Sequence, residues 1–235
     1  MLPTIDDDES RHLKRMGKMH VANGDYDEAM RCYKLALELD RQPGTPPLAL
    51  PITLNNLGVV LKYAGEYEAA LKFYSQALKI KRLAEPNNHA SLATSFYNMG
   101  RVLQRMGGGH RNREALGYLR QSLDEENKVV PRNPARIAAT LQALGQACDA
   151  EPGMHEQALR SYEQALDLYR QSLPPDHVNV ATALEDLGNA WLKANDTRKA
   201  FECLHQAAEV FEKTFPSDHP NQVRVHDKII EMLTR

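Results

Sequence analysis

Apolar residues recur along this chain at the three- and four-residue spacing that is typical of amphipathic helices. In the stretch EYEAALKFYSQAL, residues 66–78, one helical face carries Ala70, Tyr74 and Ala77. The stretch before it has an apolar face of its own, formed by Leu54, Leu57, Gly58 and Leu61. Gly65 lies between the two stretches, and glycine breaks helices. The pattern therefore predicts two amphipathic helices joined by a turn.

This two-helix unit occurs five times. A Leu-Gly or Met-Gly pair marks the first helix of each unit, and the pairs follow one another at intervals of 41, 42, 45 and 43 residues. The pairs are Met16-Gly17, Leu57-Gly58, Met99-Gly100, Leu144-Gly145 and Leu187-Gly188. Glycine in the first helix and alanine in the second let the two helix axes approach to about 8 Å. Because one unit cannot bury its apolar face alone, we expect the units to stack into an elongated array.

The pattern resembles the tetratricopeptide repeat, which has small or aromatic residues at the positions held here by Gly58, Ala70 and Tyr74. A period near 42 residues is similar to the lengthened repeats of kinesin light chains. Two linkers, PDHVNVA at 175–181 and SDHPNQV at 217–223, are similar to the Asp-His-Pro linker of that family. The resemblance implies an all-α fold, a right-handed α-solenoid of five helical hairpins plus a C-terminal capping helix.

The resemblance covers nearly the whole chain. We expect an acidic N-terminal segment at residues 1–9 and a single solenoid domain at 10–235. The repeats are expected at about residues 10–50, 51–92, 93–137, 138–180 and 181–219, with the cap helix at 220–234. The third and fourth repeats are longer than the others, and we place their extra residues in the turns between the two helices, where insertions are tolerated. These turns lie around 107–113 and 152–153.

The composition restricts the location and the partners. A net charge of −2 gives no general attraction to nucleic acid or to a membrane surface. No stretch reaches the roughly 18 apolar residues of a membrane span, and the N-terminus lacks the basic and apolar regions of a signal peptide. The cysteines Cys32, Cys148 and Cys203 lie in different repeats, which argues against a disulfide framework. We therefore expect a cytoplasmic protein.

Three histidines, His89, His177 and His219, lie in equivalent linkers of different repeats. Two helices per repeat separate such positions by more than about 10 Å, whereas metal–nitrogen bonds are about 2 Å long. We therefore expect no metal site. The acids that precede two of these histidines, Asp176 and Asp218, are expected to cap the helices that follow.

The glycine run 107–109 is the feature that most suggests a phosphate-binding loop. It lacks the Gly-Lys-Ser/Thr ending of such loops, and no predicted strand precedes it. We interpret it as a long turn. No Ser/His/Asp or Cys/His arrangement typical of nucleophilic catalysis stands out, so we expect neither an enzyme nor a cofactor.

Function is expected on the first helix of each repeat, because in the resembled family this helix lines the concave surface. By register, these positions carry seven Lys or Arg and no acid in the first three repeats. Such a surface suits an acidic extended peptide, since cations form charge-assisted bonds and asparagine can pair with a peptide backbone. The predicted peptide-binding residues are Lys14, Lys18, Asn55, Asn56, Lys62, Tyr97, Asn98, Arg101 and Arg105. The last two repeats instead offer Asp149, Glu185, Asp186 and Lys193.

The predicted function is that of a non-catalytic scaffold or adaptor that holds an acidic peptide of a partner protein. Several alternatives stay open, the simplest being that the cations only form a solvated helix face. The chain could self-associate if the terminal helix exposes Val225, Ile229 and Met232 to another copy. It could also be a ligand-sensing regulatory domain of a longer signalling protein. The acidic segment 1–9 is interpreted as a favourable charge at the first helix dipole or as an internal ligand of the groove.

Overall fold

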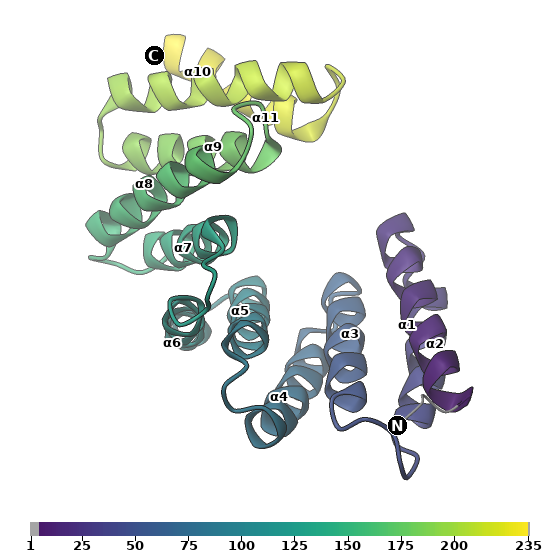
Figure 1. Cartoon of the computed structure of the whole chain (residues 1–235). Coiled ribbons are helices and arrows are strands. Elements are labelled where there is room, and N and C mark those ends of the chain that lie inside the picture. Colours follow the sequence, from purple (N-terminus) through teal and green to yellow (C-terminus); the bar gives the residue numbers. More distant parts are fainter. Residues whose placement is uncertain (1–4, 235) are drawn as a thin grey trace. The chain divides into compact units, whose positions relative to one another are not determined.

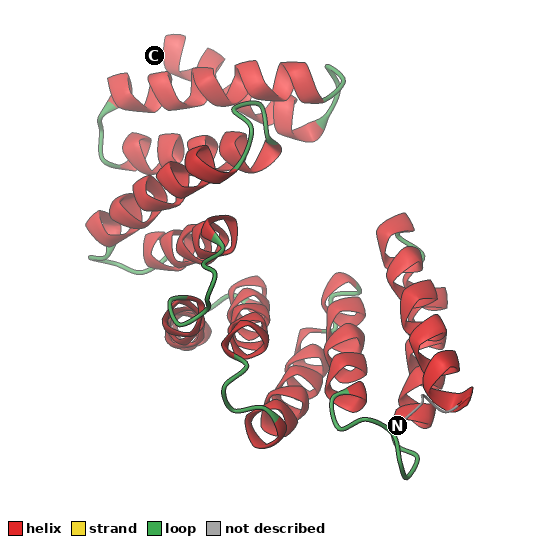
Figure 2. Cartoon of the chain, in the orientation of Figure 1, coloured by secondary structure: helices red, strands yellow, loops and turns green. Residues whose placement is uncertain are grey.

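The computed structural model describes residues 5–234, and side chains from residue 8 onward. The regular secondary structure of this part of the chain consists of eleven helices, joined by turns and loops (Figures 1 and 2). They are α1 (Ile5–Asn23), α2 (Tyr26–Asp40), α3 (Ala49–Tyr63), α4 (Tyr67–Ala84), α5 (His89–Met106), α6 (Gly109–Glu126), α7 (Pro134–Asp149), α8 (His155–Ser172), α9 (Val178–Lys193), α10 (Thr197–Thr214) and α11 (Pro220–Leu233). The predicted all-α repeat fold of five hairpins and a terminal helix is confirmed.

Each hairpin depends on the glycine of its Leu-Gly or Met-Gly pair. A Cβ atom added to Gly58 would lie 2.7 Å from the ring of Tyr74, which is fully buried on the partner helix. In the last hairpin, a Cβ on Gly188 would lie 2.8 Å from the side chain of Leu204. Because real Cβ atoms do not approach this closely, only glycine lets the two helices pack at these positions. This contact explains why the glycine recurs in every repeat.

The described residues fall into two compact units that divide after Glu125, and each unit is described by itself. The core of the first unit lies where α2, α3, α4 and α5 pack, around Leu57, Tyr74 and Phe96. In the second unit, α9 and α10 bury Leu204 and Phe211 completely. The side chains in both cores lie at the helical spacing that the sequence pattern predicts.

The extra residues of the third repeat do not enlarge its turn. The turn consists of Gly107 and Gly108, whose φ angles are +69° and +88°, and α6 begins directly after it at Gly109. The insertion therefore lengthens the N-terminal end of α6, and the prediction of a long turn at 107–113 is wrong. In the fourth repeat, the extra residue does lie in the turn between α7 and α8.

Histidines, not aspartates, cap two of the helices that follow linkers. Nδ1 of His177 accepts a hydrogen bond from the Asn179 amide at 3.0 Å, and Nδ1 of His219 accepts one from the Asn221 amide at 3.2 Å. The His219 ring also stacks on Phe215, with 3.8 Å between ring centroids. The prediction that the preceding aspartates, Asp176 and Asp218, cap these helices is wrong, because they lie one residue too early in the chain.

Candidate functional site

A hollow of about 470 Å³ in the first unit lies between the end of α3, the start of α4 and one face of α5. It is lined by Lys62, Tyr63, Tyr67, Tyr97, Arg101 and Arg105. The three α5 side chains recur every fourth residue and therefore lie on one side of that helix. The hollow brings together four of the residues predicted to bind a peptide: Lys62, Tyr97, Arg101 and Arg105.

Positive charge gathers at this hollow. None of the described residues that line it is acidic. Burial lowers the pKa of the Lys62 ammonium, and the nearby charges of Arg101 and Arg105 lower it further. Three cations held so close together repel one another, and an anion in the hollow would relieve that repulsion.

The cations are held by neutral neighbours that restrict their movement. Nζ of Lys62 lies 4.5 Å from the ring centroid of Tyr63, which is within the range of a cation–π contact. The Tyr63 ring in turn stacks almost parallel on Tyr26, with 5.4 Å between centroids and 4° between planes. On α5, Nη1 of Arg101 donates to Oε1 of Gln104 at 3.1 Å. Lys62 and Arg101 thus each have a positioning contact before any ligand binds.

Two of the predicted asparagines lie side by side on neighbouring helices. Nδ2 of Asn98 on α5 donates to Oδ1 of Asn55 on α3 at 3.2 Å. A primary amide has two donor hydrogens and an acceptor with two lone pairs, so this single bond leaves each amide further hydrogen-bonding capacity. Asn56 is half-buried on the same helix as Asn55. The predicted amide positions therefore share the α3–α5 surface with the cations.

The two predicted lysines of α1 lie in different environments. Lys14 is mostly buried, and its Nζ lies 2.8 Å from the carboxylate of Asp40, which is 4% exposed. The same carboxylate accepts hydrogen bonds from Ser10 and Thr53, so this cluster joins α1, α2 and α3. Lys14 is thus neutralised inside the protein, and we leave it out of the proposal below. Lys18, one turn further along α1, is exposed.

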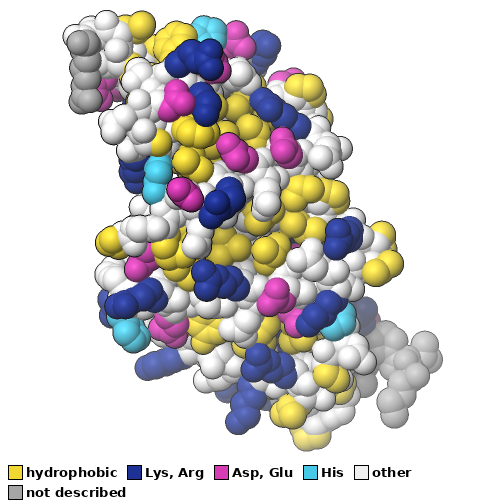
Figure 3. Space-filling model, turned by 90° about the vertical axis from the view of Figure 1, so that its left-hand side faces the viewer, with side chains coloured by type: hydrophobic (Ala, Val, Ile, Leu, Met, Phe, Trp, Pro, Cys, Tyr) yellow, Lys and Arg dark blue, Asp and Glu magenta, His cyan; other side chains and the backbone are white. Residues whose placement is uncertain are grey.

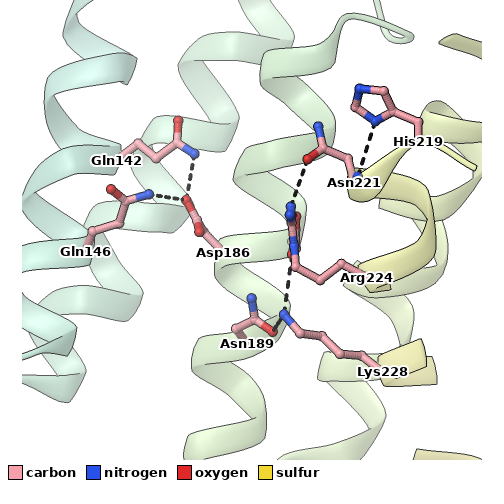
Figure 4. Close-up of polar contacts among 9 residues, drawn as sticks. Gln142, Gln146, Asp186, Asn189, His219, Asn221, Arg224 and Lys228 are labelled. Carbon is pink, nitrogen blue, oxygen red and sulfur yellow. Dashed lines mark hydrogen bonds and ion pairs between the residues drawn. The ribbon is translucent and has the colours of Figure 1, made fainter. Parts of the chain in front are cut away.

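Two acids of the second unit that were predicted to face the groove join its own helices (Figure 4). Asp186 on α9 accepts hydrogen bonds from Gln142 at 2.7 Å and from Gln146 at 2.9 Å, both on α7. Glu185 is 5% exposed and accepts two hydrogen bonds from Arg224 of α11, at 2.6 and 2.7 Å. We therefore assign these two acids, predicted to face the groove, to packing between helices.

A second hollow, of about 500 Å³, shows how differently charge is arranged in this unit. Its lining includes Asp149, Asp186 and Lys193. Here Lys193 pairs with Asp149, while two glutamine amides bind the Asp186 carboxylate. This hollow is lined by charges of both signs, whereas the described charged residues that line the hollow of the first unit are all cations.

The terminal helix does not present the apolar face that the sequence suggested. Val225 is completely buried, so the prediction that it is exposed to another copy is wrong. Ile229 and Met232 are half-buried. The exposed apolar side chains of α11 are instead Ile230, Leu233 and Val223. Arg224 and a second cation, Lys228, which donates to Asn189 at 2.8 Å, hold α11 on α9.

The surface view in Figure 3 shows Lys and Arg side chains interspersed with Asp and Glu side chains and with apolar ones. This face carries no large patch of a single charge sign. None of the helices in residues 5–234 has the length and hydropathy needed to cross a membrane.

Comparison with known families decides the class of this fold. The family model for the tetratricopeptide repeat matches residues 8–83, 49–124 and 136–213, which together make up most of the chain. The chain belongs to the tetratricopeptide repeat family. Tetratricopeptide repeat (TPR) proteins are generally non-catalytic, and the fold indicates a scaffold for protein–protein interaction.

The comparisons also found individual proteins that are similar to this chain. The photosystem I assembly protein Ycf3 of Acaryochloris marina is 30% identical over 109 residues, which are 40% of this chain and 59% of Ycf3. The crystal structure of BtubC (BKLC) from P. vanneervenii has a TM-score of 0.73 at 19% identity and covers 91% of both chains. A kinesin light chain from Podosopora anserina with nearly identical TPR-like repeats has a TM-score of 0.68 at 19% identity, covering 87% of this chain and 95% of that one. At this identity, the two structures show a shared fold alone.

Proposed function

We propose that this TPR protein is an adaptor that binds an acidic, extended peptide segment of a partner protein on the α3–α5 surface of its first unit. The observation that carries the proposal is the hollow in which Lys62, Arg101 and Arg105 converge without an acid among the described lining residues. Folding alone gains little from gathering like charges, because their repulsion destabilises the compact state. A bound anionic segment would convert this repulsion into attraction.

The neighbouring side chains suit an extended backbone. Asn55, Asn56 and Asn98 lie on the same two helices as the cations, and their amides can donate to and accept from peptide groups. Lys18 on α1 is exposed and can add to the attraction of an acidic partner during association. Cations would thus recognise acidic side chains, while amides would hold the peptide chain itself.

The proposal can be tested with a fluorescein-labelled peptide rich in Asp and Glu, with fluorescence polarisation as the readout. The test variant is Arg101→Glu/Arg105→Glu. The matched control is Lys34→Glu/Lys72→Glu, which makes the same change in net charge at exposed positions of α2 and α4. We expect the test variant to weaken binding by at least about tenfold and to flatten its salt dependence.

The control variant should bind nearly as well as the natural protein. Equal losses in both variants would mean that only net charge matters, and the site would then be misassigned. Unchanged binding in the test variant would exclude the hollow. In either case, affinity capture from a lysate followed by mass spectrometry would show which partners are kept and would direct the search to another surface.

A further inference from the structure

The hollow in the first unit is better matched to a doubly charged anion than to a single carboxylate. It joins three cations, one lysine and two arginines, at one place. A carboxylate carries one charge on two oxygens, whereas a phosphate monoester carries a charge of about −1.5 to −2 at pH 7 and three strong acceptor oxygens. The number of cations thus fits a phosphate group.

We propose that the hollow receives a phosphorylated side chain, so that the adaptor recognises a phosphorylated segment of its partner. This inference rests on the proposed function, since it names the group that anchors the acidic peptide. Phosphorylation of the partner would then switch the interaction on.

The side chains supply the contacts that a phosphate needs. Arg101 and Arg105 lie one helical turn apart on α5, and their planar guanidinium groups can form paired hydrogen bonds with phosphate oxygens. Lys62 adds a compact charge from α3, the neighbouring helix. Because Lys62 is half-buried, its interaction with an anion is screened less than it would be on an open surface.

The walls of the hollow also fit a side chain that carries a phosphate. Tyr63, Tyr67 and Tyr97 line the hollow together with the cations. The rings can pack against the carbon atoms of the ligand, and each hydroxyl can donate to an oxygen. A volume of about 470 Å³ lies within the usual range of ligand pockets, about 300–1,000 Å³. The hollow therefore has room for a side chain as well as its phosphate.

The test uses three peptides of the same acidic sequence that carry serine, glutamate or phosphoserine at the central position. We expect the phosphoserine peptide to bind at least about tenfold more tightly than the glutamate peptide. Equal binding of these two peptides would overturn the phosphate inference while leaving the proposed function intact. If none of the three binds, the proposed function fails as well.

A conservative variant separates phosphate recognition from simple charge attraction. Arg101→Lys/Arg105→Lys keeps both charges but removes the planar groups that form paired hydrogen bonds. It should weaken binding of the phosphoserine peptide much more than binding of the glutamate peptide, so that most of the preference for phosphoserine is lost. A preference that survives in this variant would contradict the assigned contacts. Circular dichroism would verify that the variant is folded.

Competition measurements identify the source of the phosphate. Inorganic phosphate should displace the phosphoserine peptide more effectively than chloride at the same ionic strength, because the hollow would bind the phosphate group itself. A single-stranded RNA oligonucleotide that displaces the peptide at equal concentration would overturn the proposal and assign the hollow to nucleic acid.

Discussion

Lys81 is a lysine that the packing of α4 against α5 removes almost entirely from water, leaving 6% of it exposed. Its Nζ donates to the hydroxyl of Ser95 at 2.9 Å, and the carbonyl oxygen of Ser91 lies 3.4 Å away. Both acceptors are neutral, and burial lowers the pKa of the ammonium from 10.5 to about 8. We predict that Lys81→Met raises the free energy of unfolding at neutral pH.

The size of the effect follows from the two pKa values. The unfolded chain binds the Lys81 proton more tightly than the folded chain, and a difference between pKa 10.5 and about 8 is equivalent to roughly 3 kcal/mol. This destabilisation is complete below pH 8, where both states are protonated. Between pH 8 and 10.5, the folded state loses the proton first, so stability rises with pH and the destabilisation disappears. Methionine cannot form the hydrogen bonds of Nζ, which offsets part of this effect. We therefore expect Lys81→Met to raise the free energy of unfolding by about 1–3 kcal/mol.

The assay is urea unfolding followed by circular dichroism between pH 7 and pH 10.5, with Lys79→Met on the solvent side of the same helix as the control. The difference between Lys81→Met and the natural protein should be largest at pH 7 and shrink towards pH 10.5. Other titrating groups, such as Tyr33, whose pKa burial raises to about 12, are common to both proteins and cancel. A variant less stable than the natural protein at every pH would refute the reasoning, because the hydrogen bonds would then outweigh the cost of burial.

Three further pairs of substitutions test the packing. Gly58→Ala should destabilise the first unit by about 1–3 kcal/mol in urea unfolding, because its Cβ meets a buried tyrosine ring, whereas Gly117→Ala, in open space on α6, should stabilise it by about 0.5–1 kcal/mol. Arg224→Met should lower the free energy of unfolding by about 1–3 kcal/mol and speed hydrogen exchange in α11. Lys228→Met should lower it less, because Lys228 makes the longer contact with the same buried acid. His219→Ala should cost about 1 kcal/mol in thermal unfolding, and His219→Asn, which keeps a capping acceptor, should recover most of it.

The repeat fold was predictable because its determinants are local in sequence. A glycine and the aromatic or aliphatic residue that fills its place lie within one hairpin, as Gly58 and Tyr74 do. A glycine packed against a partner of this kind recurs in all five hairpins, so an irregularity in one repeat does not hide the pattern. The same reasoning failed for the glycine run of the third repeat. The helix α6 begins there, at Gly109, and spacing in the sequence does not distinguish a longer turn from a longer helix.

The partners of charged side chains were not predictable, because they lie on different helices and far apart in the sequence. Lys14 and Asp40 meet across two helices, and so do Glu185 and Arg224. Helical register shows which face a residue occupies, but several opposite charges could reach that face from the next hairpin. The burial of Val225 was missed for a related reason, since the sequence predicts a capping helix but does not show which of its apolar residues faces the preceding hairpin.

The structure therefore changes which charges are informative about function. Asp186 on α9 accepts a hydrogen bond from a glutamine amide of α7, and Glu185 on α9 accepts one from Arg224 of α11. These two acids therefore serve to hold helices together. At the α3–α5 surface, burial lowers the pKa of Lys62, and repulsion by Arg101 and Arg105 lowers it further. The ion pairs and hydrogen bonds of Glu185 and Asp186 stabilise the fold, so no ligand is needed to explain these acids. Charges that repel one another do not stabilise the fold, and a bound anion would explain why they lie together. The cationic hollow of the first unit is for this reason the strongest candidate for a binding site.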